Sequence, residues 1–170
     1  MKEKLPERKK NRLTNYDYSS YGAYFITICT KNKKNFFWEK EQTYNVGEDI
    51  ILPPQKVLLT HYGKIAEKAI KSVPDKYSFL ELLQYVVMPN HIHLILRIAD
   101  NNGKMISSPT SIITVIGQMK RCVSKEIGIS VWQRSFYDHI IRNNDDYDMI
   151  SRYIYENPTK WKDDCLYTEG

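Results

Sequence analysis

Alternation of apolar and polar residues predicts a β-hairpin in the middle of the chain. Residues 85–98 read Tyr-Val-Val-Met-Pro-Asn-His-Ile-His-Leu-Ile-Leu-Arg-Ile, so a Pro-Asn turn separates two strand-like runs. Successive side chains of a strand point to opposite faces, so the even positions from 92 to 98, which are all Ile or Leu, predict a core face. The opposite face carries His91, His93, Ile95 and Arg97.

Hydrophobic periodicity predicts the remaining elements. Strands are expected at 23–30, 79–88, 91–98 and 136–142, and helices at about 57–73, 111–127 and 144–156. The order β-α-β-β-α-β-α indicates an α+β fold of the ferredoxin-like, split β-α-β type. We expect a four-stranded antiparallel sheet with helices on one face and the hairpin strands near its middle. The last helix is an addition to that fold.

Local signals refine three of these helices. The first is expected to end before Pro74, and the last to begin at an Asn144 cap and to stop at Pro158. Gly117 lies inside the second helix, where glycine costs about 1 kcal/mol relative to alanine. We therefore expect close packing or a bend at Gly117.

Length and composition favour one domain. The chain has 170 residues, of which 42% are hydrophobic, which suffices for one core. We expect a single domain over 14–170, preceded by a basic arm over 1–13 that is either a polyanion-binding arm or a solvated tail. The sequence shows no long apolar run and no signal-peptide pattern, and the cysteines (Cys29, Cys122 and Cys165) form no zinc motif. These features predict a cytoplasmic protein with reduced thiols.

Charge permits a polyanionic partner without requiring one. The formal net charge is +5 at pH 7. On the second predicted helix, polar residues form a stripe that is either a solvated face or a surface that follows phosphates. The stripe consists of Thr114, Gln118, Arg121 and Lys125, with Lys120 nearby.

The histidine pair is the first candidate for chemistry. His91 and His93 lie on one face at the start of a strand, and two neutral imidazoles placed in this way form half of a divalent-metal site. An ordinary surface strand can also carry such a pair.

The last helix supplies the second candidate. Its core stripe is Tyr147, Ile150 and Ile154, and Met149, Tyr153 and Asn157 form an adjacent stripe at spacings of four. Tyr153 could be a nucleophile beside a cation to which Asn157 lends its carbonyl oxygen. Alternatively, Tyr153 is a half-buried core residue and Asn157 a helix cap before Pro158.

Taken together, these motifs resemble the single-tyrosine HUH transposases of the IS200-like group, and most closely the REP-associated tyrosine transposases. The resemblance covers about residues 14 to 161. The main motifs are Met-Pro-Asn-His-Ile-His-Leu at 88–94 and Arg-Tyr-Ile-Tyr-Glu-Asn-Pro at 152–158. Further motifs are Tyr-Asp-Tyr at 16–18, Gly-Ala-Tyr-Phe-Ile-Thr at 22–27 and Trp-Gln-Arg-Ser-Phe-Tyr-Asp-His at 132–139.

The resemblance implies an activity and a site. Family members cleave and rejoin single-stranded DNA, commonly presented by an imperfect hairpin, through a 5′-phosphotyrosine intermediate. The implied nucleophile is Tyr153, and the implied ligands of Mg²⁺ or Mn²⁺ are His91, His93 and Asn157. Insertion-sequence members often have Gln at that third position, whereas Asn agrees with the REP-associated branch. Tyr155 lies elsewhere on the helix, and His139 is expected to be structural.

The implied partner is single-stranded DNA with a REP-like or element-end hairpin, bound by a monomer or a homodimer in the nucleoid. Candidate DNA contacts are Lys9, Lys10, Arg12, Lys120, Arg121, Lys125, Trp132 and Arg134.

Two other functions fit parts of the sequence. A zinc hydrolase could use the histidine pair with His139, His61 or a carboxylate as third ligand, but this leaves Tyr153 and Asn157 unexplained. A non-catalytic nucleic-acid-binding module is also possible, because sheets of this topology often display aromatic residues to RNA.

Overall fold

The computed structural model describes residues 16–39, 57–99 and 110–169. The basic arm expected over 1–13, with Lys9, Lys10 and Arg12, lies outside these ranges. All three cysteines lie within them as free thiols, with Cys29 buried and the other two exposed. None of the helices formed by these residues combines the length and the apolar character that a membrane span needs.

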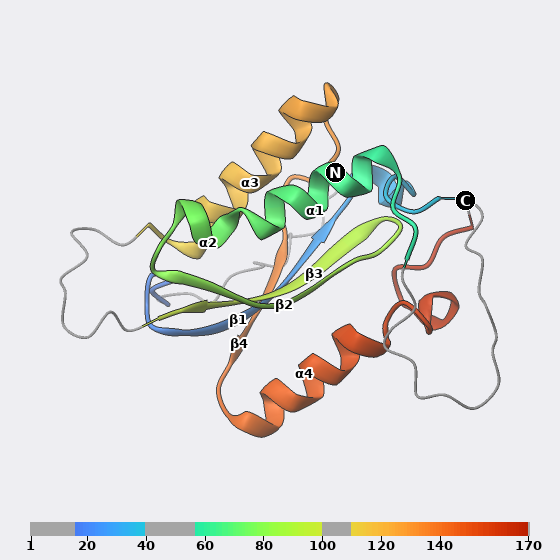
Figure 1. Ribbon diagram of the computed structural model, residues 1–170. Helices are drawn as coiled ribbons and strands as arrows, with labels where there is room; N and C mark the ends of the chain where they lie inside the picture. The colour runs from blue at the N-terminus through green and yellow to red at the C-terminus, as the bar shows by residue number, and fades with distance from the viewer. Residues whose placement is uncertain (1–15, 40–56, 100–109, 170) are drawn as a thin grey trace, which may run out of the picture.

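A four-stranded antiparallel sheet forms the centre of the fold (Figure 1). The strands are β1 (Gly22–Cys29), β2 (Leu80–Val87), β3 (His91–Ile98) and β4 (Tyr137–Ile141). Their order across the sheet is β2-β3-β1-β4, so the predicted ferredoxin-like α+β fold is confirmed. The expectation that both hairpin strands lie in the middle was wrong for β2. A helical crossover carries the chain from β1 to β2, and this places β1 beside β3 and leaves β2 at the edge.

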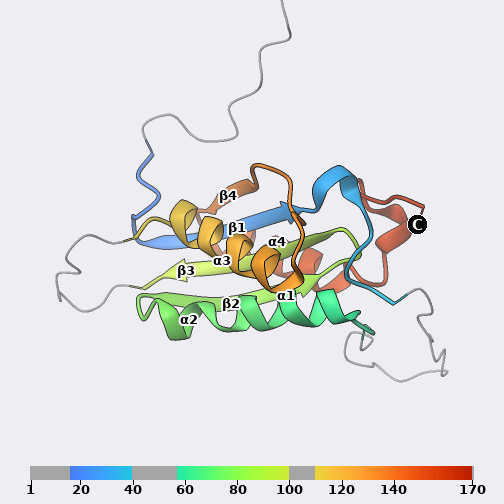
Figure 2. The ribbon, with the colours of Figure 1, turned by 90° about the horizontal axis from the view of Figure 1, so that it is seen from above.

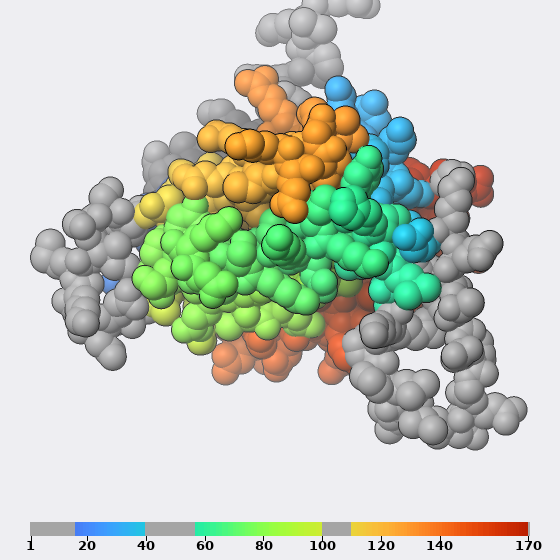
Figure 3. Space-filling model, turned by 45° about the horizontal axis from the view of Figure 1, so that its top comes forward, coloured from blue at the N-terminus to red at the C-terminus, as the bar shows by residue number. Residues whose placement is uncertain are grey.

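Helices cover one face of the sheet, which Figure 2 shows from above; Figure 3 shows the outer surface that they form. They are α1 (His61–Lys71), α2 (Val73–Lys76) and α3 (Ile112–Ile127). The main core lies between them and the sheet. It includes the apolar face predicted for β3, since Ile92, Leu94, Leu96 and Ile98 are all buried there.

Two predicted features on this face differ from the structure. The helix expected over 57–73 begins at His61, because the hydroxyl of Thr60 caps it by accepting a hydrogen bond from the Gly63 amide. The helix ends at Lys71, before Pro74 as expected, and Pro74 lies within the first turn of α2, a position that lacks an intrahelical amide partner and therefore tolerates proline. Of the two alternatives expected at Gly117, close packing or a bend, the structure excludes close packing, because a Cβ atom there would meet nothing within 4 Å.

The last helix, α4 (Asn144–Glu156), packs against the other face of the sheet. Its cap is Asn143 rather than the expected Asn144, since the side-chain oxygen of Asn143 accepts a hydrogen bond from the Asp146 amide at 2.8 Å. Ile150 and Ile154 of α4 form a small second core with Ile95 of β3. The structure therefore confirms that the histidine-bearing side of β3 faces away from the main core.

Two short 3₁₀ turns complete the described elements. They are η1 (Lys31–Lys33), which follows β1, and η2 (Trp161–Asp163), which follows α4.

Candidate metal and tyrosine site

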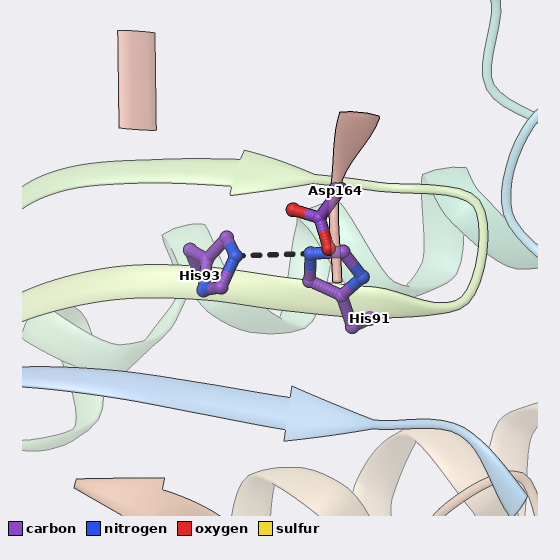
Figure 4. A group of neighbouring side chains, drawn as sticks. All are labelled: His91, His93 and Asp164. Carbon is purple, nitrogen blue, oxygen red and sulfur yellow. Dashed lines mark hydrogen bonds between the residues drawn. The ribbon is translucent and has the colours of Figure 1, made fainter. Parts of the chain in front are cut away.

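The two histidines of β3 converge on each other beneath the end of α4. His91 and His93 are almost fully buried, and their Nε2 atoms lie 2.9 Å apart (Figure 4). Because they are the first and third residues of β3, the strand alternation places both rings on the same face.

Asn90 fixes the tautomer of His91. The side-chain nitrogen of Asn90 donates hydrogen bonds to the carbonyl oxygens of Lys33 and Leu166. The side-chain oxygen of Asn90 therefore faces Nδ1 of His91, at 2.8 Å. This oxygen can only accept, so Nδ1 of His91 carries the proton. The lone pair on Nε2 of His91 is therefore directed into the site, as a metal ligand requires.

The neighbouring strand β1 holds His93. Nδ1 of His93 lies 2.8 Å from the hydroxyl of Thr27, its partner in the β1–β3 register. Phe25 lies two residues earlier on the same face, and its ring stacks on that of His93 with centroids 5.2 Å apart. Both contacts restrict the rotation of the imidazole.

Burial keeps both imidazoles neutral. Desolvation lowers the pKa of His91 to about 4, against an opposing contribution from the Asp164 carboxylate. Desolvation also lowers the pKa of His93 well below 6.5, and the neighbouring His91 lowers it further. Neutral imidazole is the form that binds metal ions.

Asp164 is a site residue that the sequence did not indicate. Its carboxylate and the imidazoles of His91 and His93 each offer a ligand atom within 4.8 Å of the others. Figure 4 shows the carboxylate directed toward the imidazole pair from the C-terminal segment. Asp164 follows the η2 turn in a polar stretch without periodicity, so no local pattern marks it. Two histidines and a carboxylate fit a divalent metal ion.

Tyr153 of α4 brings its phenol to this group. Its hydroxyl lies 3.3 Å from Nε2 of His93 and donates a hydrogen bond to Asp164 at 3.2 Å. The ring stands edge-on to His93, yet 41% of the residue remains exposed. Desolvation, reinforced by the charge of Asp164, raises the pKa of Tyr153 to about 12.

Asn157 combines the two roles that the sequence left open. Its amide NH donates to the carbonyl oxygen of Tyr153 at the end of α4, so it is the C-cap. Its side-chain nitrogen donates to Asp164 at 3.1 Å, which places the carboxamide in the site. The side-chain oxygen of Asn157 is buried and makes no hydrogen bond within the described part of the chain. Such an orphaned oxygen is the donor that a hard divalent cation requires.

The C-terminal segment is fastened over the histidines. Asn90 donates to the carbonyl oxygen of Leu166, and Asn35 donates to that of Thr168. The ring of Trp161 lies 5.9 Å from that of His91. These contacts hold Asp164 in place.

The candidate DNA contacts are dispersed. Arg121 and Lys125 are exposed on α3, which lies on the opposite side of the sheet from Tyr153. The ammonium of Lys120 donates to the carbonyl oxygens of Gln133 and Ser135. Trp132 is only 7% exposed and packs against Phe37, so its ring offers no face to a nucleobase. Arg134 is exposed just before β4.

Three residues with site-like chemistry remain outside the site. Tyr155 is 48% exposed on another side of α4. His139 pairs with Asp146 at 2.8 Å near the start of α4, which fits its expected structural role. His61 is exposed at the start of α1, on the opposite face of the sheet.

Known proteins resemble the chain in sequence. It is 30% identical to an uncharacterised protein of Haemophilus influenzae, and the similarity covers 97% of this chain and 96% of that protein. It is 27% identical to a putative REP-associated tyrosine transposase of the same species, across 87% of this chain and 77% of the relative. It is also 26% identical to the REP-associated tyrosine transposase of Escherichia coli, across 84% of this chain and 70% of that protein. No protein-family profile matches the chain.

A solved structure shares the fold. A REP-associated tyrosine transposase bound to a REP hairpin superposes with a TM-score of 0.57 at 22% identity, over 88% of this chain and 74% of that one. The relatives carry the same family name that the histidine and tyrosine motifs suggest. The chain therefore belongs to the IS200-like REP-associated tyrosine transposases.

Proposed function

We propose that this transposase cleaves and rejoins single-stranded DNA next to a hairpin, with Tyr153 as the nucleophile and Mg²⁺ or Mn²⁺ as the cofactor. The observation that carries the proposal is the position of the Tyr153 hydroxyl, 3.3 Å from Nε2 of His93 and 3.2 Å from Asp164. A phenol beside a candidate metal site is suited to attack a phosphate bound there.

The residues present fit a divalent cation. His91, His93 and Asp164 would hold it, and the unpaired oxygen of Asn157 is a further donor in the same hydrogen-bonded group. When bound, the cation would stabilise negative charge on the phosphate oxygens. Mg²⁺ and Mn²⁺ accept this mixed set of nitrogen and oxygen donors and retain water at the remaining positions.

The protein side chains orient and restrain the nucleophile. Asp164 accepts the hydrogen bond from the phenol, and Phe25 contacts the ring edge-on with centroids 6.2 Å apart. A pKa of about 12 keeps Tyr153 protonated at neutral pH, so the phenol must lose its proton as it attacks.

The proposed step exchanges one phosphodiester for another. A bond forms between the phenolic oxygen of Tyr153 and phosphorus, and the bond from phosphorus to the 3′ oxygen of the preceding nucleotide breaks. The phenolic proton passes to solvent, and the leaving 3′ oxygen takes up a proton. The 5′-phosphotyrosine conserves the bond energy, so a 3′-hydroxyl can reverse the step and join strands without ATP.

A hairpin-bearing DNA strand is the proposed substrate. The related structure contains a REP hairpin, and this chain has a formal net charge of +5. Because α4 places Tyr153 beside the histidines of the same chain, one protomer holds a complete set of reacting groups. This arrangement supports a monomer that acts in cis.

The test is a denaturing gel of 5′- and 3′-labelled hairpin DNA taken from the sequence that flanks the gene. Wild-type protein, Tyr153→Phe and Tyr155→Phe are incubated with Mn²⁺ or with EDTA. We expect a protein–DNA adduct that survives SDS, requires Mn²⁺ and disappears only in Tyr153→Phe. Tyr155→Phe is the matched control, because it removes a phenol from the same helix at a position away from the site.

Other outcomes would favour the other functions. Cleavage without an adduct that persists in Tyr153→Phe would indicate a hydrolase, for which zinc dependence is the further check. Tight binding of hairpin DNA without any cleavage would indicate a non-catalytic binding module.

A further inference from the structure

The sheet register places an exposed tyrosine in line with the histidine pair. Thr27 of β1 pairs with His93 on one side and with Tyr137 of β4 on the other. Cross-strand partners point to the same face, so Tyr137, Thr27 and His93 form one row across three strands. With neighbouring strands about 4.8 Å apart, the row spans about 10 Å from Tyr137 to His93.

This part of the sheet face is open at the β4 edge. Tyr137 is 55% exposed although it belongs to a strand, and the neighbouring Phe25 is only partly buried. The ion pair between β4 and α4 lies two residues beyond Tyr137 along β4, where His139 contacts Asp146. A flat ligand can therefore reach the Tyr137 ring and remain beside the site.

The segment before β4 adds a positive charge on a fixed support. The buried side chains of Trp132 and Phe136 flank it, and Lys120 donates hydrogen bonds to two of its carbonyl oxygens. Arg134 is exposed between them. The exposed Arg134 and the exposed ring of Tyr137, three residues later, offer the two features that bind a single-stranded nucleotide, a positive charge for its phosphate and a ring for its base.

We infer that Tyr137, with Arg134, forms a subsite for a nucleotide next to the scissile phosphate, whose base stacks on the Tyr137 ring. The inference rests on the proposed function, since it takes single-stranded DNA as the occupant. It adds a route for the strand, which crosses the β4 edge and follows the Tyr137–Thr27–His93 row to the histidines. The occupant is a nucleobase rather than an apolar peptide because Arg134 complements a phosphate and the row leads to the proposed phosphate-binding site.

The test is a fluorescence scan with hairpin DNA from the sequence flanking the gene, in which 2-aminopurine replaces successive bases of the single-stranded flank. EDTA in the buffer prevents cleavage. We expect wild-type protein to quench the probe at one flank position close to the cleavage site. Tyr137→Trp should keep that quenching, and Tyr137→Thr should abolish it and weaken binding about tenfold. Threonine is chosen because it favours strands, so the variant should retain β4.

Tyr21→Thr is the matched control. Tyr21 is 61% exposed and directly precedes β1, six residues from Thr27, or about 20 Å along an extended chain. Tyr21→Thr should leave the 2-aminopurine quenching and the affinity for the hairpin DNA unchanged. Unchanged quenching in Tyr137→Thr, equal effects of both substitutions, or no quenching of any flank position by wild-type protein would each overturn the inference.

A second measurement separates this subsite from the proposed chemistry. With Mn²⁺, Tyr137→Thr should raise KM for the flanked hairpin about tenfold while kcat changes little, because a nucleotide stack mainly contributes to binding. Tyr153→Phe should do the reverse, abolishing the adduct while retaining the quenching. If wild-type protein forms no adduct but quenching still depends on residue 137, the proposed chemistry fails and the binding subsite stands.

Discussion

The side-chain oxygen of Asn90 accepts a hydrogen bond from Nδ1 of His91 at 2.8 Å. The nitrogen of the same side chain donates to the carbonyl oxygen of Leu166, two residues after Asp164. One residue of the hairpin turn thus sets the tautomer of a candidate ligand and anchors the segment that supplies another.

Asn90→Ala should therefore weaken metal binding. Loss of the partner that orients a ligating histidine typically reduces metal affinity 10- to 100-fold, and we expect a reduction in this range for Mn²⁺. Isothermal titration or the EPR signal of free Mn²⁺ measures it. Asn35→Ala is the control, because Asn35 also holds the C-terminal segment, and its side-chain nitrogen and oxygen both bond to Thr168 rather than to His91. Equal losses in the two variants would contradict a role of Asn90 in setting the tautomer.

The ionisation of Tyr153 should respond to Asp164. Burial and the carboxylate both favour the neutral phenol and raise its pKa to about 12, so the metal-free protein should keep Tyr153 protonated at pH 10, where exposed tyrosines are half ionised. Absorbance at 295 nm, taken as the difference between wild type and Tyr153→Phe, follows this single group. Asp164→Asn removes the negative charge and should shift the titration to lower pH, though burial keeps it above 10. A shift to higher pH would show that the carboxylate does not act in this way.

The position of α4 on the sheet should depend on a pair of hydrogen bonds. The side-chain nitrogen of Gln84 donates to the carbonyl oxygen of Ser151 at 3.0 Å, and the hydroxyl of Ser151 donates to the side-chain oxygen of Gln84 at 2.7 Å. Gln84 follows an irregularity in the β2–β3 register, and Ser151 lies two residues before Tyr153. At about 1 kcal/mol for each hydrogen bond, Gln84→Ala should lower the free energy of unfolding by about 2 kcal/mol in urea titrations.

A second position on β2 serves as the control for that measurement. Glu81 forms an exposed ion pair with Arg97, and such pairs contribute about 0–1 kcal/mol. Glu81→Ala should therefore lower the free energy of unfolding by less than Gln84→Ala does. Equal losses would mean that the Gln84–Ser151 pair contributes no more than a surface contact.

Two glycines in helices should respond in opposite ways to alanine. At Gly63 a Cβ atom would collide with the carbonyl oxygen of Phe37, so Gly63→Ala should destabilise the protein by about 1–3 kcal/mol. At Gly117 the space is open, so Gly117→Ala should raise the free energy of unfolding by about 0.5–1 kcal/mol through the better helix propensity of alanine. Thermal unfolding of both variants measures the difference. Stabilisation by Gly63→Ala would mean that the chain near Phe37 moves away at little cost.

The sequence alone identified the four strands, the three longer helices and the faces on which their side chains lie. Period-two alternation identified the two faces of β3, because a buried strand face must be continuously apolar. The spacing of Ile150 and Ile154 identified the buried side of α4, and from it the side that bears Tyr153. Both inferences depend on neighbours within one element, where geometry fixes the direction of each side chain.

Only the tertiary structure decided which segments meet. Nothing local indicates that Asp164 returns to the histidines, because its position is set by anchors at Asn90 and Asn35, more than 70 residues away along the chain. The burial of Trp132 and the hydrogen bonds of Lys120 likewise depend on contacts between segments. The order of the strands has the same origin: β1 pairs with β3 and β4 because the helical crossovers allow it, and pairings between distant segments leave no periodic signal in the sequence.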